Sequence, residues 1–177
     1  DQVGGGFARY SVDANWLVPH FEKMLYDNGQ LLSLYSEAYT VTKNPLYRKI
    51  VYQTVNFFER ELMNEEGGFF AALDADSEGE EGKFYVWRKD ELEKIFNDSF
   101  SSEQCDLLLE FYRVTDNGNW EHGKNILHNH LTAAEFAMNK NMPEQEFLSL
   151  QEEAERILLI ERSTRIRPGM DDKILTG

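Results

Sequence analysis

Two long stretches of helical periodicity, separated by an Asn-Pro pair, constrain the fold of this chain more than any other feature. Apolar side chains recur at helical spacing from about residue 19 to residue 43, and again from residue 45 to about residue 64. Asn44 is a favoured N-cap and Pro45 a favoured first-turn residue, so a second helix is expected to begin there. The one-residue joint predicts an antiparallel helical hairpin.

Shorter elements are expected after this hairpin. Helical patterns continue over four further segments: 90–97, 102–112, 132–141 and 143–165. Ser101 with Gln104, and Thr132 with Glu135, have the spacing of capping boxes at two of the helix starts. Residues 84–87 (Phe-Tyr-Val-Trp) predict a strand within a loop-rich excursion. The predicted fold class is mainly α, with antiparallel helical hairpins and a short β-hairpin and loop excursion.

The ends of the chain and a weak internal echo suggest a piece of a larger helical array. The sequence begins in a glycine loop and stops shortly after Ile174, so residues 1–177 are interpreted as one domain fragment, truncated at both ends. Gly5-Gly6-Phe7 recurs as Gly67-Gly68-Phe69, in each case before an apolar stretch and then an aspartate. Either the copies belong to stacked helical repeats, or Gly-Gly-aromatic simply marks a helix stop before a turn.

Charge and composition exclude several classes of partner. The chain has 32 acidic and 18 basic residues and a net charge of −14, which repels phosphate backbones and anionic lipid surfaces. We therefore expect neither a nucleic-acid nor a membrane partner. Cys105 is the only cysteine, which excludes an internal disulfide and a cysteine zinc site and indicates a reducing, cytoplasmic compartment.

The first candidate site lies in the stretch VPHFEKMLYDN, residues 18–28. A helix beginning at Pro19 would place His20, Lys23 and Asp27 on one face, at i, i+3 and i+7. His20 would then lie near the positive end of the helix dipole, which favours a neutral imidazole that can act as a base. The alternative is a helix-start histidine that hydrogen-bonds to a neighbouring loop.

The second candidate site is the run of acids from Asp74 to Glu81. Its D-x-D-x-E-G start resembles a calcium loop, but position 12 is Tyr85, where an EF-hand needs glutamate, so no metal and no cofactor are expected. Asp74 and Asp76 follow an apolar stretch and are candidates for the paired carboxyls of glycosidase chemistry. A solvated acidic turn is the alternative, and it is preferred for the two glutamates that end the run.

Aromatic and charged residues beside these loops are candidates for substrate binding. Tyr10, Trp16 and Trp87 could stack on sugar rings, although core filling is the ordinary role of such residues. The chain also contains His122, His128 and His130, which are interpreted as loop histidines because no third zinc ligand has an obvious spacing.

Asp171, Asp172 and Lys173 follow the last long helix. The two acids are either a dipole-stabilised pair at a helix start or part of a polar cleft shared with Asp74 and Asp76. In such a cleft, at least one acid should titrate above its ordinary value unless Lys23, Lys173 or Arg9 offsets the charge.

Seven segments resemble, in the same order, the family of spermatogenesis-associated protein 20. They are residues 1–7 (DQVGGGF), 9–11 (RYS), 18–28 (VPHFEKMLYDN), 72–79 (ALDADSEG), 84–87 (FYVW), 125–127 (NIL) and 167–176 (RPGMDDKILT). The resemblance implies an N-terminal thioredoxin-like domain, absent here, followed by an α/α toroid similar to six-hairpin glycosidases and N-acylglucosamine 2-epimerases. Many relatives have His where this chain has Ala8, so no role of that imidazole is carried over.

Two classes of function follow. The first is a carbohydrate-processing epimerase or hydrolase with His20, Asp74 and Asp76 as catalytic residues. Its substrate-binding candidates are Arg9, Tyr10, Trp16, Lys23, Asp27, Trp87, Asp171, Asp172 and Lys173. The second is a non-catalytic helical scaffold that binds a partner or holds the thioredoxin-like domain. As an early arc of a toroid, the chain would lack neighbouring hairpins, so apolar surface is expected to remain exposed and to favour self-association.

Overall fold

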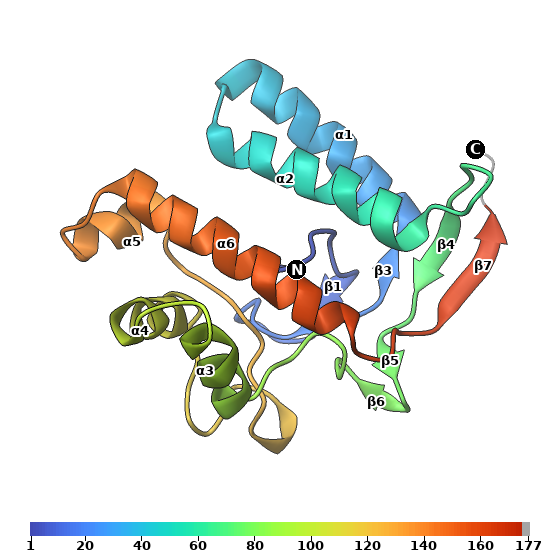
Figure 1. Ribbon diagram of the computed structural model, residues 1–177. Helices are drawn as coiled ribbons and strands as arrows, with labels where there is room; N and C mark the ends of the chain where they lie inside the picture. The colour runs from blue at the N-terminus through green and yellow to red at the C-terminus, as the bar shows by residue number, and fades with distance from the viewer. Residues whose placement is uncertain (175–177) are drawn as a thin grey trace. The chain divides into compact units, whose positions relative to one another are not determined.

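A computed structural model describes residues 1–174 and divides them into two compact units (Figure 1). Unit 1 contains residues 3–84 and the segment from Ile166 onward, together with Asp1, and unit 2 contains residues 85–165 together with Gln2. The helices of unit 1 are α1 (Leu25–Thr42), α2 (Pro45–Phe57) and the π-helix η1 (Phe58–Leu62). Its strands are β1 (Tyr10–Ser11), β2 (Pro19–His20), β3 (Lys23–Met24), β4 (Phe70–Leu73), β5 (Asp76–Ser77), β6 (Glu80–Glu81) and β7 (Met170–Ile174).

The predicted helical hairpin is confirmed in α1 and α2, which lie side by side in Figure 1. Lys43, with a φ of 56°, ends α1 in the left-handed conformation that commonly closes a helix. Asn44 caps α2, since its Oδ1 accepts a hydrogen bond from the Leu46 N–H at 3.0 Å, and Pro45 follows in the first turn.

The predicted start of the first helix at Pro19 is wrong, because α1 begins at Leu25. Residues 19–24 are extended: His20 pairs with Tyr10 in β1, and Lys23 pairs with Leu73 in β4. Neighbouring side chains in an extended segment alternate between its two sides. Accordingly, Phe21 and Lys23 are buried, whereas His20 and Glu22 are partly exposed.

The core of unit 1 lies where α2 and η1 meet the sheet. Phe57, Phe58, Leu62 and Leu73 are buried together, with partly buried Leu25, Leu32 and Phe69 around them. The sheet has the order β3-β4-β7 and is antiparallel, with Ala72 of β4 opposite Asp171 of β7. Asp171 and Asp172 therefore lie in a strand rather than in the first turn of a helix. The toroid helix expected beyond Lys173 falls largely on residues outside the described ones.

The acidic run forms a β-hairpin of β5 and β6, with Asp76 opposite Glu81 and Ser77 opposite Glu80. Its two central residues, Glu78 and Gly79, have φ values of 55° and 76°, as a type I′ turn requires. The short β-hairpin in the predicted excursion is thus confirmed.

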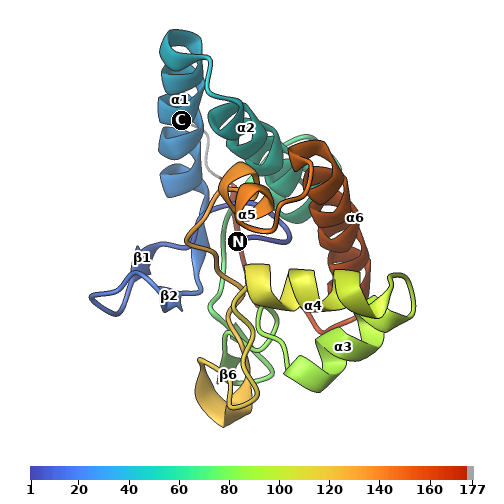
Figure 2. The ribbon, with the colours of Figure 1, turned by 90° about the vertical axis from the view of Figure 1, so that its left-hand side faces the viewer.

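Unit 2 is built from helices that follow the predicted segments closely (Figure 2). They are α3 (Lys89–Asn97), α4 (Ser102–Phe111), the short 3₁₀ helix η2 (Glu121–Gly123), α5 (Ala133–Asn139) and α6 (Glu144–Ser163). Both predicted capping boxes, at Ser101 and Thr132, are present. The rings of Phe111, Phe136 and Phe147 pack together between α4, α5 and α6, with centroids 4.7–5.1 Å apart.

The strand predicted at residues 84–87 is wrong. Only Trp87 makes a β-bridge, to Asn125, and its ring is completely buried in unit 2 with the Arg165 guanidinium 3.8 Å from the ring centroid. The apolar side chains of residues 84–87 therefore belong to a segment without regular secondary structure, and its Phe84, Val86 and Trp87 are buried. Helices outweigh strands in residues 1–174, so the fold is mainly α with small sheets, and the toroid arrangement stays a prediction. None of the helices in this range is both long and apolar enough to cross a bilayer.

Candidate functional site

The two candidate sites of the sequence meet in unit 1 at His20. Its Nδ1 lies 2.9 Å from Oε1 of Glu81 in β6, and its Nε2 lies 3.7 Å from Oε2 of Glu22. The His20 side chain is 26% exposed, so the imidazole has both carboxylates beside it and remains open to solvent. A partly exposed imidazole between two carboxylates is a group that can exchange protons with a ligand.

Local strand geometry sets the orientation of the imidazole. Tyr10 lies opposite His20 in the β1–β2 ladder, and the two rings stack with centroids 4.9 Å apart. Arg9, one residue earlier, donates from Nη1 to Oε2 of Glu22 at 2.9 Å, and this hydrogen bond raises the pKa of Arg9. Asp27, in the first turn of α1, raises it slightly further and is favourably placed at the helix start.

The hairpin that carries Glu81 is fixed against the rest of unit 1. Gly82 has a φ of 73°, and a Cβ there would lie 2.5 Å from the buried ring of Phe21. The Gly82 N–H donates to the Ala75 carbonyl at 3.0 Å, and Ser77 Oγ donates to the Ile166 carbonyl at 2.6 Å. Because Phe21 is the residue next to His20, this close approach brings Glu81 to the imidazole.

Asp76 joins this arrangement, and Asp74 does not. Asp76 lies directly opposite Glu81 in an antiparallel pair, which places the two side chains on one face of the hairpin. Asp74 is exposed and accepts from the Ala75 N–H at 2.7 Å, while its own N–H donates to the Gly169 carbonyl at 2.7 Å. Within residues 1–174, no hydrogen bond or ion pair joins the Asp74 side chain to His20.

Glu81 and Glu22 were missed by sequence reasoning. Glu81 was interpreted as part of a solvated turn, and Glu22 was not considered. The available signal was the two-residue sequence Glu78-Gly79 between short polar flanks, which would have predicted a hairpin with Asp76 opposite Glu81. The contact with His20 joins residues 61 positions apart, and no local pattern predicts it.

Lys23 is a buried structural residue, which corrects the expectation that it lines a substrate cleft. Its Nζ donates to Oδ2 of Asp1 at 2.7 Å and to the Gly5 carbonyl at 2.8 Å, and lies 4.7 Å from the centre of the Phe57 ring. The predicted face shared with His20 does not exist, because the two side chains lie on opposite sides of an extended segment.

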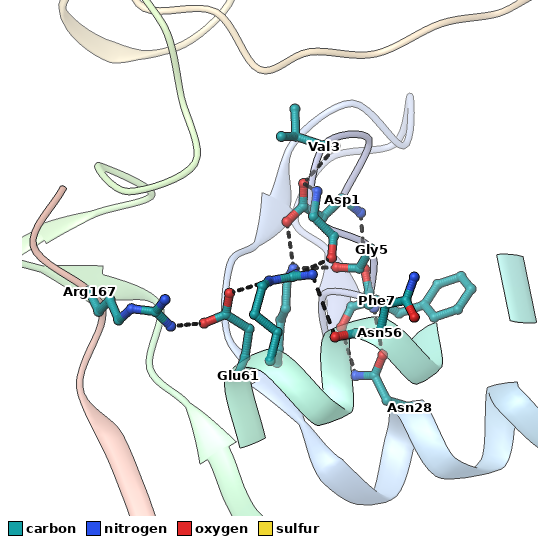
Figure 3. Close-up of polar contacts among 12 residues, drawn as sticks. Asp1, Val3, Gly5, Phe7, Asn28, Asn56, Glu61 and Arg167 are labelled. Carbon is teal, nitrogen blue, oxygen red and sulfur yellow. Dashed lines mark hydrogen bonds and ion pairs between the residues drawn. The ribbon is translucent and has the colours of Figure 1, made fainter. Parts of the chain in front are cut away.

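Three further hydrogen bonds hold the same loop, two with Asn28, as Figure 3 shows, and one from Arg60. The completely buried Asn28 accepts from the Phe7 N–H at 2.6 Å and donates to the Phe7 carbonyl at 3.0 Å. Arg60 donates to the Gly4 carbonyl and pairs with the buried Glu61, which also pairs with Arg167. Asp1 and residues 3–7 are therefore a fixed part of unit 1, and they lead through Arg9 into β1.

The C-terminal candidates lie in β7, which pairs with β4, whereas His20 lies in the separate β1–β2 ladder. Lys173 Nζ donates to Oδ2 of Asp171 at 3.2 Å, and this hydrogen bond lowers the pKa of Asp171. Lys173 thus offsets the charge of Asp171, which is the exception allowed for in the sequence analysis. Among residues 1–174, no hydrogen bond or ion pair links Asp171, Asp172 or Lys173 to His20.

The two tryptophans proposed for sugar stacking differ in burial. Trp87 is completely buried in unit 2, so its proposed place at a cleft rim is wrong. Trp16, in the loop between β1 and β2, is 86% exposed.

Of the loop histidines, His128 and His130 stack edge to face, and burial lowers the pKa of His128. Residues 1–174 contain no group of three side chains placed to hold a metal ion.

Asp13 holds the loop that carries Trp16. Its carboxylate accepts hydrogen bonds from the N–H groups of Asn15, Leu17 and Val18 at 2.7–2.9 Å and from Ser11 Oγ at 3.0 Å. These bonds, that of Val18 above all, lower the pKa of Asp13.

We expect the loop to loosen at acid pH. Because the pKa of Asp13 is depressed in the folded loop, its stabilising effect is complete above the ordinary pKa of an aspartate, about 3.9, and is lost as the pH falls through the lower folded value. Asp13→Asn should loosen the loop at neutral pH as well. Hydrogen exchange of the Leu17 and Val18 amides measures both effects; amides as protected in Asp13→Asn as in the parent would contradict them.

Comparisons with known proteins give the chain its relatives. No protein-family model matches it. It is 35% identical to uncharacterized protein B0495.5 of Caenorhabditis elegans, over the whole chain and 27% of that relative. It is 33% identical to spermatogenesis-associated protein 20 of Homo sapiens, over the whole chain and 25% of that relative. The chain is similar to the spermatogenesis-associated protein 20 family. The Mus musculus protein of that name is 35% identical over 72% of the chain and 19% of its own length.

These matches support the family resemblance seen in the seven sequence segments. The chain spans about a quarter of the length of the curated relatives it matches. The activity, substrates and partners of the whole spermatogenesis-associated proteins are therefore matters for proposal.

Proposed function

We propose that unit 1 carries an acid–base site for a small carbohydrate, with His20 as the proton-transferring group and Glu81 as the carboxylate that orients it. The observation that carries this proposal is the 2.9 Å contact between His20 Nδ1 and Glu81 Oε1. A carboxylate accepts from Nδ1–H of a neutral imidazole, so this contact fixes the tautomer that leaves Nε2 as the base.

The residues next to His20 suit both steps of a proton transfer, which are the removal of a proton from the ligand and its return. When Nε2 takes a proton from a ligand, the imidazolium lies between Glu81 and Glu22, whose carboxylates stabilise its charge. The ligand's carbonyl oxygen takes up the electron pair, and returning the proton to the neighbouring carbon completes an isomerisation, whereas an epimerisation requires its return to the opposite face of the same carbon. Asp76, opposite Glu81, is the available second carboxyl for a hydrolytic variant of the chemistry.

We further propose that the chain is an early arc of an α/α toroid in a longer, cytoplasmic protein with a thioredoxin-like domain. The helical hairpin of α1 and α2 and the family resemblance support this proposal. Leu34 and Val41, both exposed on α1, are apolar residues that a neighbouring hairpin would cover. The same exposure favours the second candidate function, a scaffold that binds a protein partner.

Deuterium incorporation tests the acid–base proposal. In D₂O, the chain should exchange a carbon-bound proton of a simple aldose or N-acyl amino sugar, which NMR of the sugar detects. His20→Gln should slow the exchange by about 100-fold or more, the usual contribution of a general base. Glu81→Gln should slow it strongly, while the tertiary fold is retained.

Glu65→Gln is the matched control, because it removes the same charge from an exposed turn of unit 1. It should leave the exchange rate unchanged. If no sugar exchanges a proton and no sugar shifts the His20 ring signals, the acid–base proposal is wrong and the scaffold is favoured.

A further inference from the structure

Trp16 is an exposed aromatic side chain held in an unfavourable conformation. It is 86% exposed and has a φ of 58°, a left-handed backbone that bulky residues rarely adopt. Strained residues persist where the surrounding structure fixes them, and they concentrate at ligand clamps and active sites. Both features are unfavourable for folding alone, so they call for a functional explanation.

The loop around Trp16 is rigid because the Asp13 carboxylate binds three of its backbone N–H groups. The Val12 N–H also donates to the Val18 carbonyl at 2.9 Å, which closes the base of the loop on the β1–β2 ladder. A preformed loop does not lose conformational entropy on binding, so an aromatic side chain that it carries can bind a ligand at low entropic cost.

Trp16 belongs to the same hairpin as the His20 site. Tyr10, whose ring stacks on His20, and Val12, two residues further along, are also exposed, and side chains two apart share one side of an extended segment. The hairpin therefore presents apolar side chains next to the proton-transferring imidazole.

The charges around this hairpin restrict the ligand. Four exposed carboxylates belong to the adjoining segment: Asp74, Asp76, Glu78 and Glu81. The nearby cations are already paired, Lys83 with Glu78 at 2.9 Å and Arg9 with Glu22 at 2.9 Å. An anionic ligand would therefore be repelled, whereas a neutral or cationic ligand would not.

We propose that Trp16 is the platform on which the ring of an uncharged or amino-bearing sugar stacks, and that the site rejects anionic sugars. This inference rests on the proposed function of the His20 site. An indole offers a flat apolar face to the C–H groups of a sugar ring, and an ammonium group is in addition attracted to the face of the indole.

Three probes that differ in charge test the inference: D-glucose, D-glucosamine and D-glucose 6-phosphate. NMR follows the indole N–H signal of Trp16, assigned by its absence in Trp16→Phe, together with the His20 ring signals. We expect the first two sugars to shift both sets of signals, and the phosphate to bind at least tenfold more weakly than glucose. Trp16→Ala should weaken glucose binding at least tenfold. Val41→Ala, at a similarly exposed site on α1, should not weaken it.

Each outcome separates the two proposals. Suppose that the sugars shift the His20 signals but not the Trp16 signal, and that Trp16→Ala binds glucose as tightly as the parent protein. The proposal that Trp16 is a stacking platform would then be wrong, and the acid–base proposal for His20 would stand. Equal affinity for glucose and its 6-phosphate would overturn the charge selection. If no probe shifts either residue, both proposals fail, and a change in self-association of Trp16→Ala would then assign the exposed indole to a protein contact.

Discussion

Gly5→Ala is expected to lower the free energy of unfolding by about 3 kcal/mol or more. A Cβ at Gly5 would lie 2.3 Å from the backbone carbonyl oxygen of Gln53, which cannot move without disturbing α2. Overpacking of this kind costs about 1–3 kcal/mol, and an alanine at the φ of 69° adds about 1–2 kcal/mol. Urea denaturation of unit 1, followed through a local probe such as the Phe57 resonances, measures the loss.

Gly67→Ala is the control, because Gly67 has a φ of 82° but no heavy atom within 4 Å of the added Cβ. Gly67→Ala should lower the free energy of unfolding by about 1–2 kcal/mol, which is the cost of the backbone strain alone. Equal losses at both glycines would mean that Gly5 is not packed against Gln53 of α2.

Lys23→Met is expected to destabilise unit 1 by about 3–5 kcal/mol, the usual cost of removing one partner of a buried ion pair. The substitution leaves the Asp1 carboxylate and the Gly5 carbonyl buried without the ammonium that both now contact. Thermal and urea unfolding measure the change.

Lys173→Met is the control, because it tests whether the loss of stability comes from the burial of the lysine rather than from the loss of its charge. Lys173 also pairs with an aspartate, but its side chain is largely exposed, so a change of less than about 0.5 kcal/mol is expected. If Lys23→Met instead folded with unaltered stability and lost sugar binding, the assignment of Lys23 to a cleft would be restored.

The helices of this chain could be predicted from its sequence because their signals are local. Asn44-Pro45 and the capping boxes at Ser101 and Thr132 act within one turn of the residues they order. Periodicity alone placed the first helix start wrongly. Residues 19–24 contain good helix formers, but their backbone groups pair with β1 and β4, which the chain brings near them only after folding.

The site could be predicted in part for the same reason. His20 and Asp76 stand out as chemical residue types beside apolar stretches, and the structure brings their segments together. Their arrangement depends on Gly82 fitting against Phe21 and on Glu81 reaching the imidazole, both of which join distant parts of the chain. Trp16 and Trp87 were indistinguishable by sequence, since burial is a property of the folded core.

The sequence of unit 1 is interrupted, since β6 and β7 are separated by all of residues 85–165. In chain order, unit 2 therefore occupies the long connection between two strands of unit 1. Closing a longer loop costs little, about 0.6 kcal/mol for each doubling of its length. A change in the length of that connection would therefore cost unit 1 little closure entropy, and the residues around His20 all lie outside it.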